Sequence, residues 1–127
     1  VILIQLPQNL TPERRHRAPQ KTVGLWLKQS TPEDVMIMSN SSQEVFYAER
    51  EFVPLPPGVP TPEGPGRSYK EILQFAKQKG VKYILINRNT PELNPDFPKS
   101  IQATDLKEFY KYKDKNGNMT IVYEVMD

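Results

Sequence analysis

The sequence contains no cysteine among its 127 residues. This absence excludes a disulfide framework, a zinc site built on thiolates and a cysteine nucleophile. Histidine occurs once, at position 16, where it stands among arginines. A solvated side chain is the expected role of such a histidine, and one imidazole without a second metal ligand does not predict a transition-metal site.

Long apolar segments are also lacking. The longest apolar runs have four residues, as at positions 1–4 and 83–86, whereas a membrane-spanning helix needs about 20. The chain nevertheless begins at Val1, inside an apolar run and without an initiator methionine. We interpret the sequence as a fragment of a longer protein.

Neither sign of charge dominates, because 17 basic residues stand against 15 acidic ones. Nucleic-acid-binding domains gather basic residues on one face, and the one dense basic cluster here is residues 14–17. No nucleic-acid partner is therefore expected. The length suits one domain, and a composition of 37% hydrophobic and 25% charged residues is typical of a globular protein.

Prolines divide the chain into two parts. They interrupt residues 1–19, which we predict to be an irregular, membrane-proximal segment, at Pro7, Pro12 and Pro19. Residues 20–127 are predicted to form a single α/β domain. Its first helix is expected to start at residue 20.

Helical and strand-like segments alternate through this domain. Strands are predicted at 35–38, 52–55 and 81–86, with helices before and between them. Pro54 favours an edge position for the second strand, because proline donates no hydrogen bond to a neighbour. Helices between strands predict parallel pairing. The expected fold is a small three-layer, Rossmann-like sheet of three parallel strands plus a C-terminal antiparallel hairpin, with helices on both faces.

Short-range signals mark several element ends. Ser68 and Glu71 match a helix capping box, and Gly80 suits the left-handed residue that ends the same helix. Asn116-Gly117 predicts the turn of the hairpin formed by residues 106–113 and 119–125. Arg50 follows a short helix, where a positive charge complements the helix dipole by about 0.3–1 kcal/mol.

Polar residues follow two of the predicted parallel strands. Ser39, Asn40 and Ser41 follow the first, and Asn87 and Arg88 follow the third. Ligands of open parallel sheets bind beyond the carboxyl ends of the strands, so this cluster is a candidate site for a sugar or an anion. The alternative is structural: serine and asparagine also cap helices and turns, and this is their commoner role.

Six segments, in this order and spacing, carry a family resemblance. They are GLWLKQSTP (24–32), VMIMS (35–39), FYAER (46–50), VPLP (53–56), YKEIL (69–73) and AKQKGVKYILI (76–86). Together they resemble the C-terminal soluble region of prokaryotic membrane glycosyltransferases of the dolichyl-phosphate-mannose protein mannosyltransferase type. The resemblance covers roughly residues 20 to 90.

The resemblance implies a particular role. Enzymes of that family transfer a sugar from a polyprenyl-phosphate carrier, with their catalytic carboxylate in a region that has no counterpart in this chain. The chain would then be a non-catalytic accessory domain on the extracytoplasmic face of the cell membrane, with no cofactor. Its partners would be the remainder of the transmembrane chain and an acceptor protein or glycan.

Two other functions are compatible with the predicted fold. One is a free-standing domain that binds a small ligand or a nucleotide. The other is a small enzyme, but the sequence lacks the paired groups that acid–base or nucleophilic catalysis needs. The fold alone does not distinguish an accessory domain from a free-standing binding domain.

Overall fold

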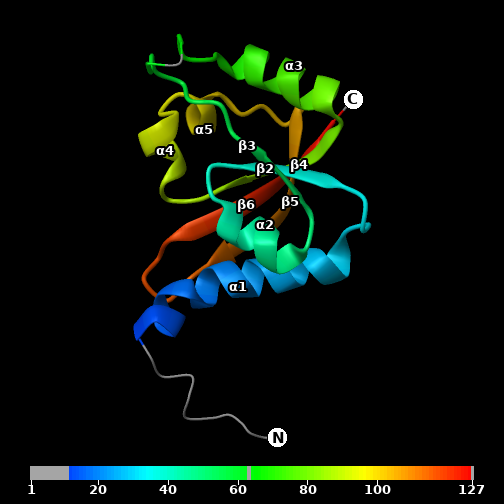
Figure 1. Cartoon of the computed structure of the whole chain (residues 1–127), viewed down its shortest axis with the longest axis vertical. Helices are drawn as coiled ribbons and strands as arrows, with labels where there is room; N and C mark the ends of the chain where they lie inside the picture. Colours follow the sequence, from blue (N-terminus) through cyan, green and yellow to red (C-terminus); the bar gives the residue numbers. More distant parts are fainter. Residues whose placement is uncertain (1–11, 63, 127) are drawn as a thin grey trace, which may run out of the picture.

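Figure 1 traces the chain through its helices and strands. The computed structural model describes residues 12–62 and 64–126. The elements, in chain order, are α1 (Pro12–Ser30), β2 (Met36–Ser39), α2 (Ser42–Ala48), β3 (Glu51–Pro54), α3 (Tyr69–Lys79), β4 (Val81–Ile86), α4 (Thr90–Leu93), α5 (Phe97–Ser100), β5 (Leu106–Lys113) and β6 (Met119–Val125).

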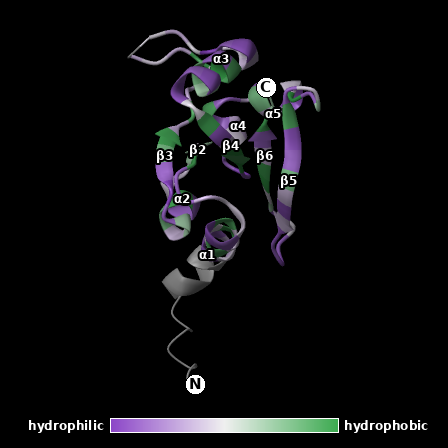
Figure 2. Cartoon of the chain, turned by 90° about the vertical axis from the view of Figure 1, so that its right-hand side faces the viewer, coloured by the Kyte–Doolittle hydropathy of each residue, from purple (hydrophilic) through white to green (hydrophobic). Residues whose placement is uncertain are grey.

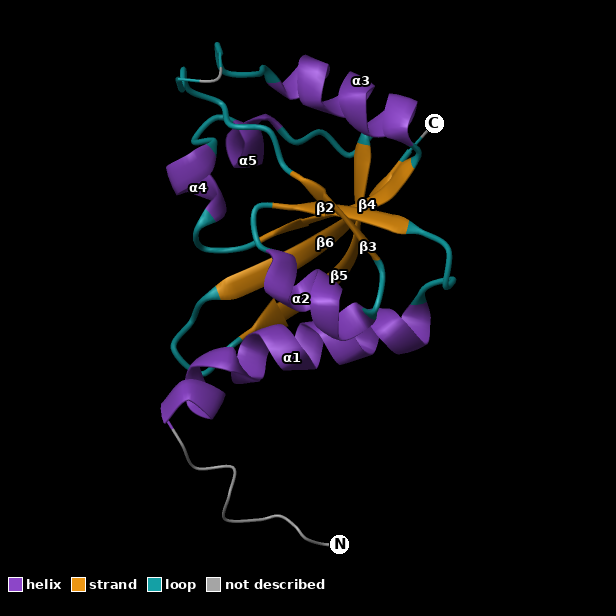
Figure 3. Cartoon of the chain, viewed as in Figure 1, coloured by secondary structure: helices purple, strands orange, loops and turns teal. Residues whose placement is uncertain are grey.

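A single mixed sheet forms the centre of the described part of the chain (Figure 3). Its strand order is β3-β2-β4-β6-β5. Strand β2 is parallel to β3 and to β4, whereas β6 is antiparallel to both β4 and β5. Strands β5 and β6 have 8 and 7 residues, against 4 each in β2 and β3, so most of the sheet is antiparallel.

The predicted fold class, a Rossmann-like sheet of three parallel strands carrying a hairpin, is therefore wrong. The last strand in sequence, β6, is an inner strand beside β4, and β5 forms the edge. Strand β6 buries Thr120, Val122 and Val125, while β5 exposes most of its side chains and is largely hydrophilic in Figure 2. The more apolar strand of the hairpin takes the inner place because burial favours apolar side chains there.

Helices cover both faces of this sheet. Helices α1 and α2 lie on one side, and α3, α4 and α5 lie on the other (Figure 1). Strand β4 serves both layers because successive side chains of a strand point to opposite faces. Tyr83 and Leu85 pack with residues of α1 and α2, whereas Ile84 and Ile86 pack with residues of α3 and α5.

Helix α1 begins at Pro12, earlier than the sequence indicates. The prediction of an irregular segment is wrong for residues 12–19, and residues 1–11 lie outside the described part. Proline is tolerated in the first turn of a helix, where its missing N–H has no partner to lose. Pro19 lies inside the helix, where proline removes one intrahelical hydrogen bond. Apolar contacts of the same helix, through Val23 and Leu27, anchor it to the sheet.

The α1 and α2 backbones approach closely at Gly24. A Cβ atom added at this position would lie 2.4 Å from Cβ of Tyr47 and 2.6 Å from the carbonyl oxygen of Glu44. Only glycine fits such a crossing without moving one helix. Gly24 therefore determines how near α2 sits to α1.

Arg50 joins the C-terminal ends of the same two helices. Its guanidinium donates to the carbonyl oxygens of Lys28 and Thr31 at 3.0 and 2.8 Å, and to the Thr31 hydroxyl at 3.2 Å. It also donates to the carbonyl oxygens of Ala48 and Glu49 at 2.9 and 3.3 Å. One side chain thus satisfies carbonyl groups that a helix end leaves without an intrahelical partner.

Candidate functional site

A polar cleft lies beyond the carboxyl end of β4. Because β6 is antiparallel to β4 and pairs Ile121 with Ile86, the start of β6 lies beside the end of β4. The turn between β5 and β6 is therefore brought next to residues 87–89. The inner position of β6 is what places this turn at the cleft.

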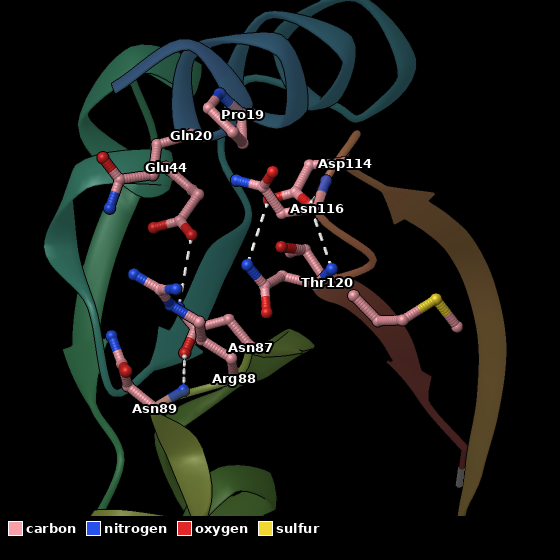
Figure 4. Close-up of a pocket in the computed structure, with 11 residues that line it drawn as sticks. Pro19, Gln20, Glu44, Asn87, Arg88, Asn89, Asp114, Asn116 and Thr120 are labelled. Carbon is pink, nitrogen blue, oxygen red and sulfur yellow. Dashed lines mark hydrogen bonds between the residues drawn. The ribbon is translucent and has the colours of Figure 1, made fainter. Parts of the chain in front are cut away.

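Four parts of the chain line the cleft, which has a volume of about 220 Å³. Figure 4 shows α1 and α2 on one side, the segment after β4 opposite, and the β5–β6 turn beside them. The lining residues are Pro19, Gln20, Glu44, Asn87, Arg88, Asn89, Asp114, Asn116, Asn118, Met119 and Thr120.

Asn87 connects the floor of the cleft to α2. Its Oδ1 accepts the backbone N–H of Asn89 at 2.9 Å, and its Nδ2 donates to Oε2 of Glu44 at 3.3 Å. A backbone N–H is always a donor, so the Asn87 oxygen must face it. The amide of Asn87 is thereby oriented with its NH₂ group toward Glu44.

Asn40 holds the side-chain amide of Asn87 in this orientation. Its Nδ2 donates to Oδ1 of Asn87 at 3.1 Å, and its Oδ1 accepts the Thr90 hydroxyl at 2.6 Å. The Thr90 hydroxyl oxygen in turn accepts the backbone N–H of Asn87 at 2.9 Å. Two backbone N–H groups thus determine the direction of every hydrogen bond in the network.

Glu44 is the end of this network. Its side chain lies in the first turn of α2 and the residue is 1% exposed. Oε2 accepts from Asn87, whereas Oε1 is buried and has no hydrogen-bond partner among the described residues. An unpaired buried acceptor costs about 1–3 kcal/mol, and more when it is charged. Glu44 is therefore the one lining residue whose bonding is incomplete in this way within the described part of the chain.

The β5–β6 turn presents a rigid polar surface to the cleft. Oδ1 of Asp114 accepts the backbone N–H groups of Asn116 and Asn118 at 2.8 and 2.9 Å. The bond from Asn118 is the main reason that the pKa of Asp114 lies below its ordinary value of 3.8, and the nearby charge of Arg88 acts in the same direction. Gly117 has a φ of 86°, which only glycine adopts at little cost.

The lining has a small excess of negative charge. Glu44 and Asp114 are acidic, and Arg88 is the only cation among the described residues that line the cleft. The other polar lining groups are mainly side-chain amides, which both donate and accept. Such a surface suits a ligand with many neutral hydroxyl groups better than an anion.

The structure separates the five predicted site residues. Asn87 and Arg88 line the cleft, and Asn40 lies behind it as a support for Asn87. Ser39 is buried, and its Oγ accepts the N–H of Ser41 at 3.1 Å. Ser41 is the N-cap residue of α2. Neither serine lines this cleft. Ser39 has the structural role that was the alternative, whereas the Ser41 side chain makes no capping hydrogen bond.

Sequence reasoning missed Glu44 and the β5–β6 turn. A signal for Glu44 existed, because it shares the buried face of α2 with Val45 and Ala48, and a carboxylate on such a face is unusual. The pattern of Asn116 and Gly117 indicates only a turn. Nothing in their local sequence says which side of the sheet edge the turn will join.

Within the described residues, no group of three or more histidine, cysteine, aspartate or glutamate side chains is arranged to hold a metal ion. None of the described helices combines the length and the apolar character needed to cross a membrane. Neither protein-family models nor curated protein sequences give a match to this chain.

Proposed function

We propose that this chain is a non-catalytic accessory domain of a polyprenyl-phosphate-sugar-dependent membrane glycosyltransferase, placed on the extracytoplasmic face of the membrane. Its role is to position the glycan or the acceptor for the membrane-embedded part of the same protein. The observation that carries the proposal is the polar cleft beyond β4, with its incompletely bonded Glu44. The family resemblance of residues 20 to 90 supports it independently.

The lining of the cleft supports a saccharide as ligand. Each sugar hydroxyl donates one hydrogen bond and accepts others, and the amides of Asn87, Asn89 and Asn116 offer both kinds of partner. A nucleotide is supported less, because its phosphates would meet two carboxylates, of Glu44 and Asp114, and one guanidinium. The free-standing nucleotide-binding alternative therefore has less support than the accessory domain.

The bonding of the two carboxylates supports a non-catalytic role. Both oxygens of Asp114 accept hydrogen bonds from its own turn, and one oxygen of Glu44 is held by Asn87. General acid–base chemistry needs a carboxylate positioned against a second reacting group. Among the described residues, neither carboxylate is hydrogen-bonded to a hydroxyl nucleophile, and we therefore propose binding as the function of the cleft.

The test is an NMR titration of the isotope-labelled chain with neutral mannose, glucose and galactose oligosaccharides. The expected result is shift changes confined to residues 87–89, residues 114–120 and the side-chain NH₂ groups of the lining asparagines. Changes confined to other surfaces, or none with any oligosaccharide, would contradict the proposal. In a parallel reaction with polyprenyl-phosphate mannose, detectable sugar transfer by the chain alone would refute its non-catalytic part.

A further inference from the structure

We infer that Oε1 of Glu44 is the acceptor for a hydroxyl group of the bound saccharide, and that this carboxylate makes the cleft selective for neutral sugars over anionic ones. This inference deepens the proposed function and rests on it. It assigns ligand recognition to one oxygen atom and limits the expected ligands to neutral saccharides.

The first support is the burial of an unsatisfied acceptor. Glu44 is 1% exposed, and Oε1 lacks a partner among the described residues. Buried polar atoms are nearly always bonded in native proteins. An orphaned atom at a lined cleft therefore points to a group that is supplied from outside, and a hydroxyl donor is the neutral group that fits.

The second support is the fixed direction of the hydrogen bonds behind it. Asn87 must direct its NH₂ group to Oε2 of Glu44, because its Oδ1 already accepts from the backbone of Asn89 and from Asn40. The network cannot reverse without leaving a backbone N–H unpaired. Oε2 of Glu44 is therefore used by Asn87, and Oε1 is the oxygen that remains for the ligand.

Gln20 and Arg88 both line the cleft with Glu44 (Figure 4), and Arg88 is exposed. Since exposed side chains change rotamer on the picosecond-to-nanosecond timescale, Arg88 is free to reorient as a ligand enters the cleft. Arg88 then donates to a second oxygen of the ligand, as a saccharide with neighbouring hydroxyls allows.

The charges around Oε1 determine which saccharides enter. An anionic sugar, such as a uronic acid, brings its carboxylate near Glu44 and Asp114, and Arg88 offsets only one of these charges. A neutral sugar meets no such repulsion. The cleft should therefore bind a neutral oligosaccharide more tightly than the same oligosaccharide carrying one uronic acid.

The decisive variant is Glu44→Gln. Because Asn87 directs its NH₂ group at position 44, the new glutamine keeps its oxygen toward Asn87 and turns its own NH₂ group toward the ligand. The cleft then presents a donor where the ligand hydroxyl needs an acceptor. We expect binding of a neutral oligosaccharide to weaken by about tenfold or more, with the amide fingerprint of the fold retained.

The double variant Glu44→Gln, Asn87→Asp tests the direction of the bonds. Aspartate at position 87 still accepts from Asn89 and Asn40, but now also accepts the NH₂ group of the glutamine. The glutamine oxygen then faces the ligand, and the total charge equals that of the natural chain. Binding should return to within a few-fold of the natural affinity. Persistent loss in this folded double variant would overturn the inference.

The matched control is Glu51→Gln, an exposed residue on the edge strand β3. It removes the same charge without touching the cleft, so affinity should not change. If the natural chain binds a neutral oligosaccharide and Glu44→Gln binds it equally well, the orphaned oxygen holds a buried water only and the inference fails alone. If the natural chain binds no neutral oligosaccharide, the proposed function fails with it. Tighter binding of the uronic acid form would refute the selectivity.

Discussion

Replacement of Arg50 by alanine should destabilise the packing of α1 and α2, the two helices that form one side of the cleft. The guanidinium joins carbonyl groups of Lys28 and Thr31 at the end of α1 to those of Ala48 and Glu49 at the end of α2. Hydrogen bonds to charged groups contribute about 1.5–3 kcal/mol each when considered singly. These bonds share one partly exposed group and are not additive, so we expect a total loss of about 2–4 kcal/mol.

The effect should be large because α2 has little stability of its own. A helix of 7 residues is too short to persist without tertiary contacts. Arg50→Lys keeps the positive charge near both helix ends but replaces the planar fork by one nitrogen. It should restore part of the lost stability, leaving a deficit of about 1–2 kcal/mol.

Urea unfolding followed by circular dichroism measures these losses. With an m-value of about 2 kcal/mol per molar urea, the midpoint of Arg50→Ala should fall by about 1–2 M relative to the natural chain. Arg67→Ala, at an exposed position in the proline-rich loop, is the control and should change stability by less than about 0.5 kcal/mol. Natural stability in Arg50→Ala, or equal stability in the lysine and alanine variants, would refute the reasoning.

Two further predictions concern the walls of the cleft. Gly24→Ala should destabilise the chain by about 1–3 kcal/mol, because the new Cβ would lie 2.4 Å from Cβ of Tyr47. This loss should exceed the gain from the higher helix propensity of alanine. A higher urea midpoint would contradict the close crossing of α1 and α2. Asp114→Asn should reduce stability at neutral pH, because the carboxylate of Asp114 accepts bonds from its turn that lower its pKa below 3.8. The stabilisation by Asp114 is complete above pH 3.8 and is lost as the pH falls through the lowered pKa. The two unfolding curves should therefore converge in acid, and a difference that grows on acidification would be inconsistent with this account.

Local signals in the sequence predicted local structure well. Ser68 and Glu71 form the expected capping box, with bonds of 2.9 and 3.2 Å between each side chain and the other's backbone N–H. Gly80 ends α3 with a φ of 84°, and Gly117 occupies the hairpin turn with a φ of 86°. These features depend on residues a few positions apart, so the sequence pattern contains all the interacting groups. Arg50 shows the limit of such local prediction. Its interaction with the dipole of α2 could be predicted from its position in the sequence, but its hydrogen bonds to the end of α1 could not.

The candidate site was predictable only in part for the same reason. Asn87 and Arg88 follow a strand, and the rule for the carboxyl ends of parallel strands is sufficient to select them. Glu44 lines the cleft because α2 crosses α1 at Gly24. Asp114 lines it because β6, and not β5, pairs with β4. Both arrangements depend on contacts between residues far apart in the chain.

Local sequence is sufficient to place most helices, strands and turns, because turn residues, caps and apolar periodicity act within a few positions. The order of the strands depends on long-range packing, which produces the mostly antiparallel mixed sheet in place of the predicted three parallel strands with a hairpin. The physical reason is competition for burial: either strand of the hairpin can pair with β4, and the more apolar β6 gains more from the inner place. That choice carries the β5–β6 turn to the end of β4, where it closes the cleft around Glu44.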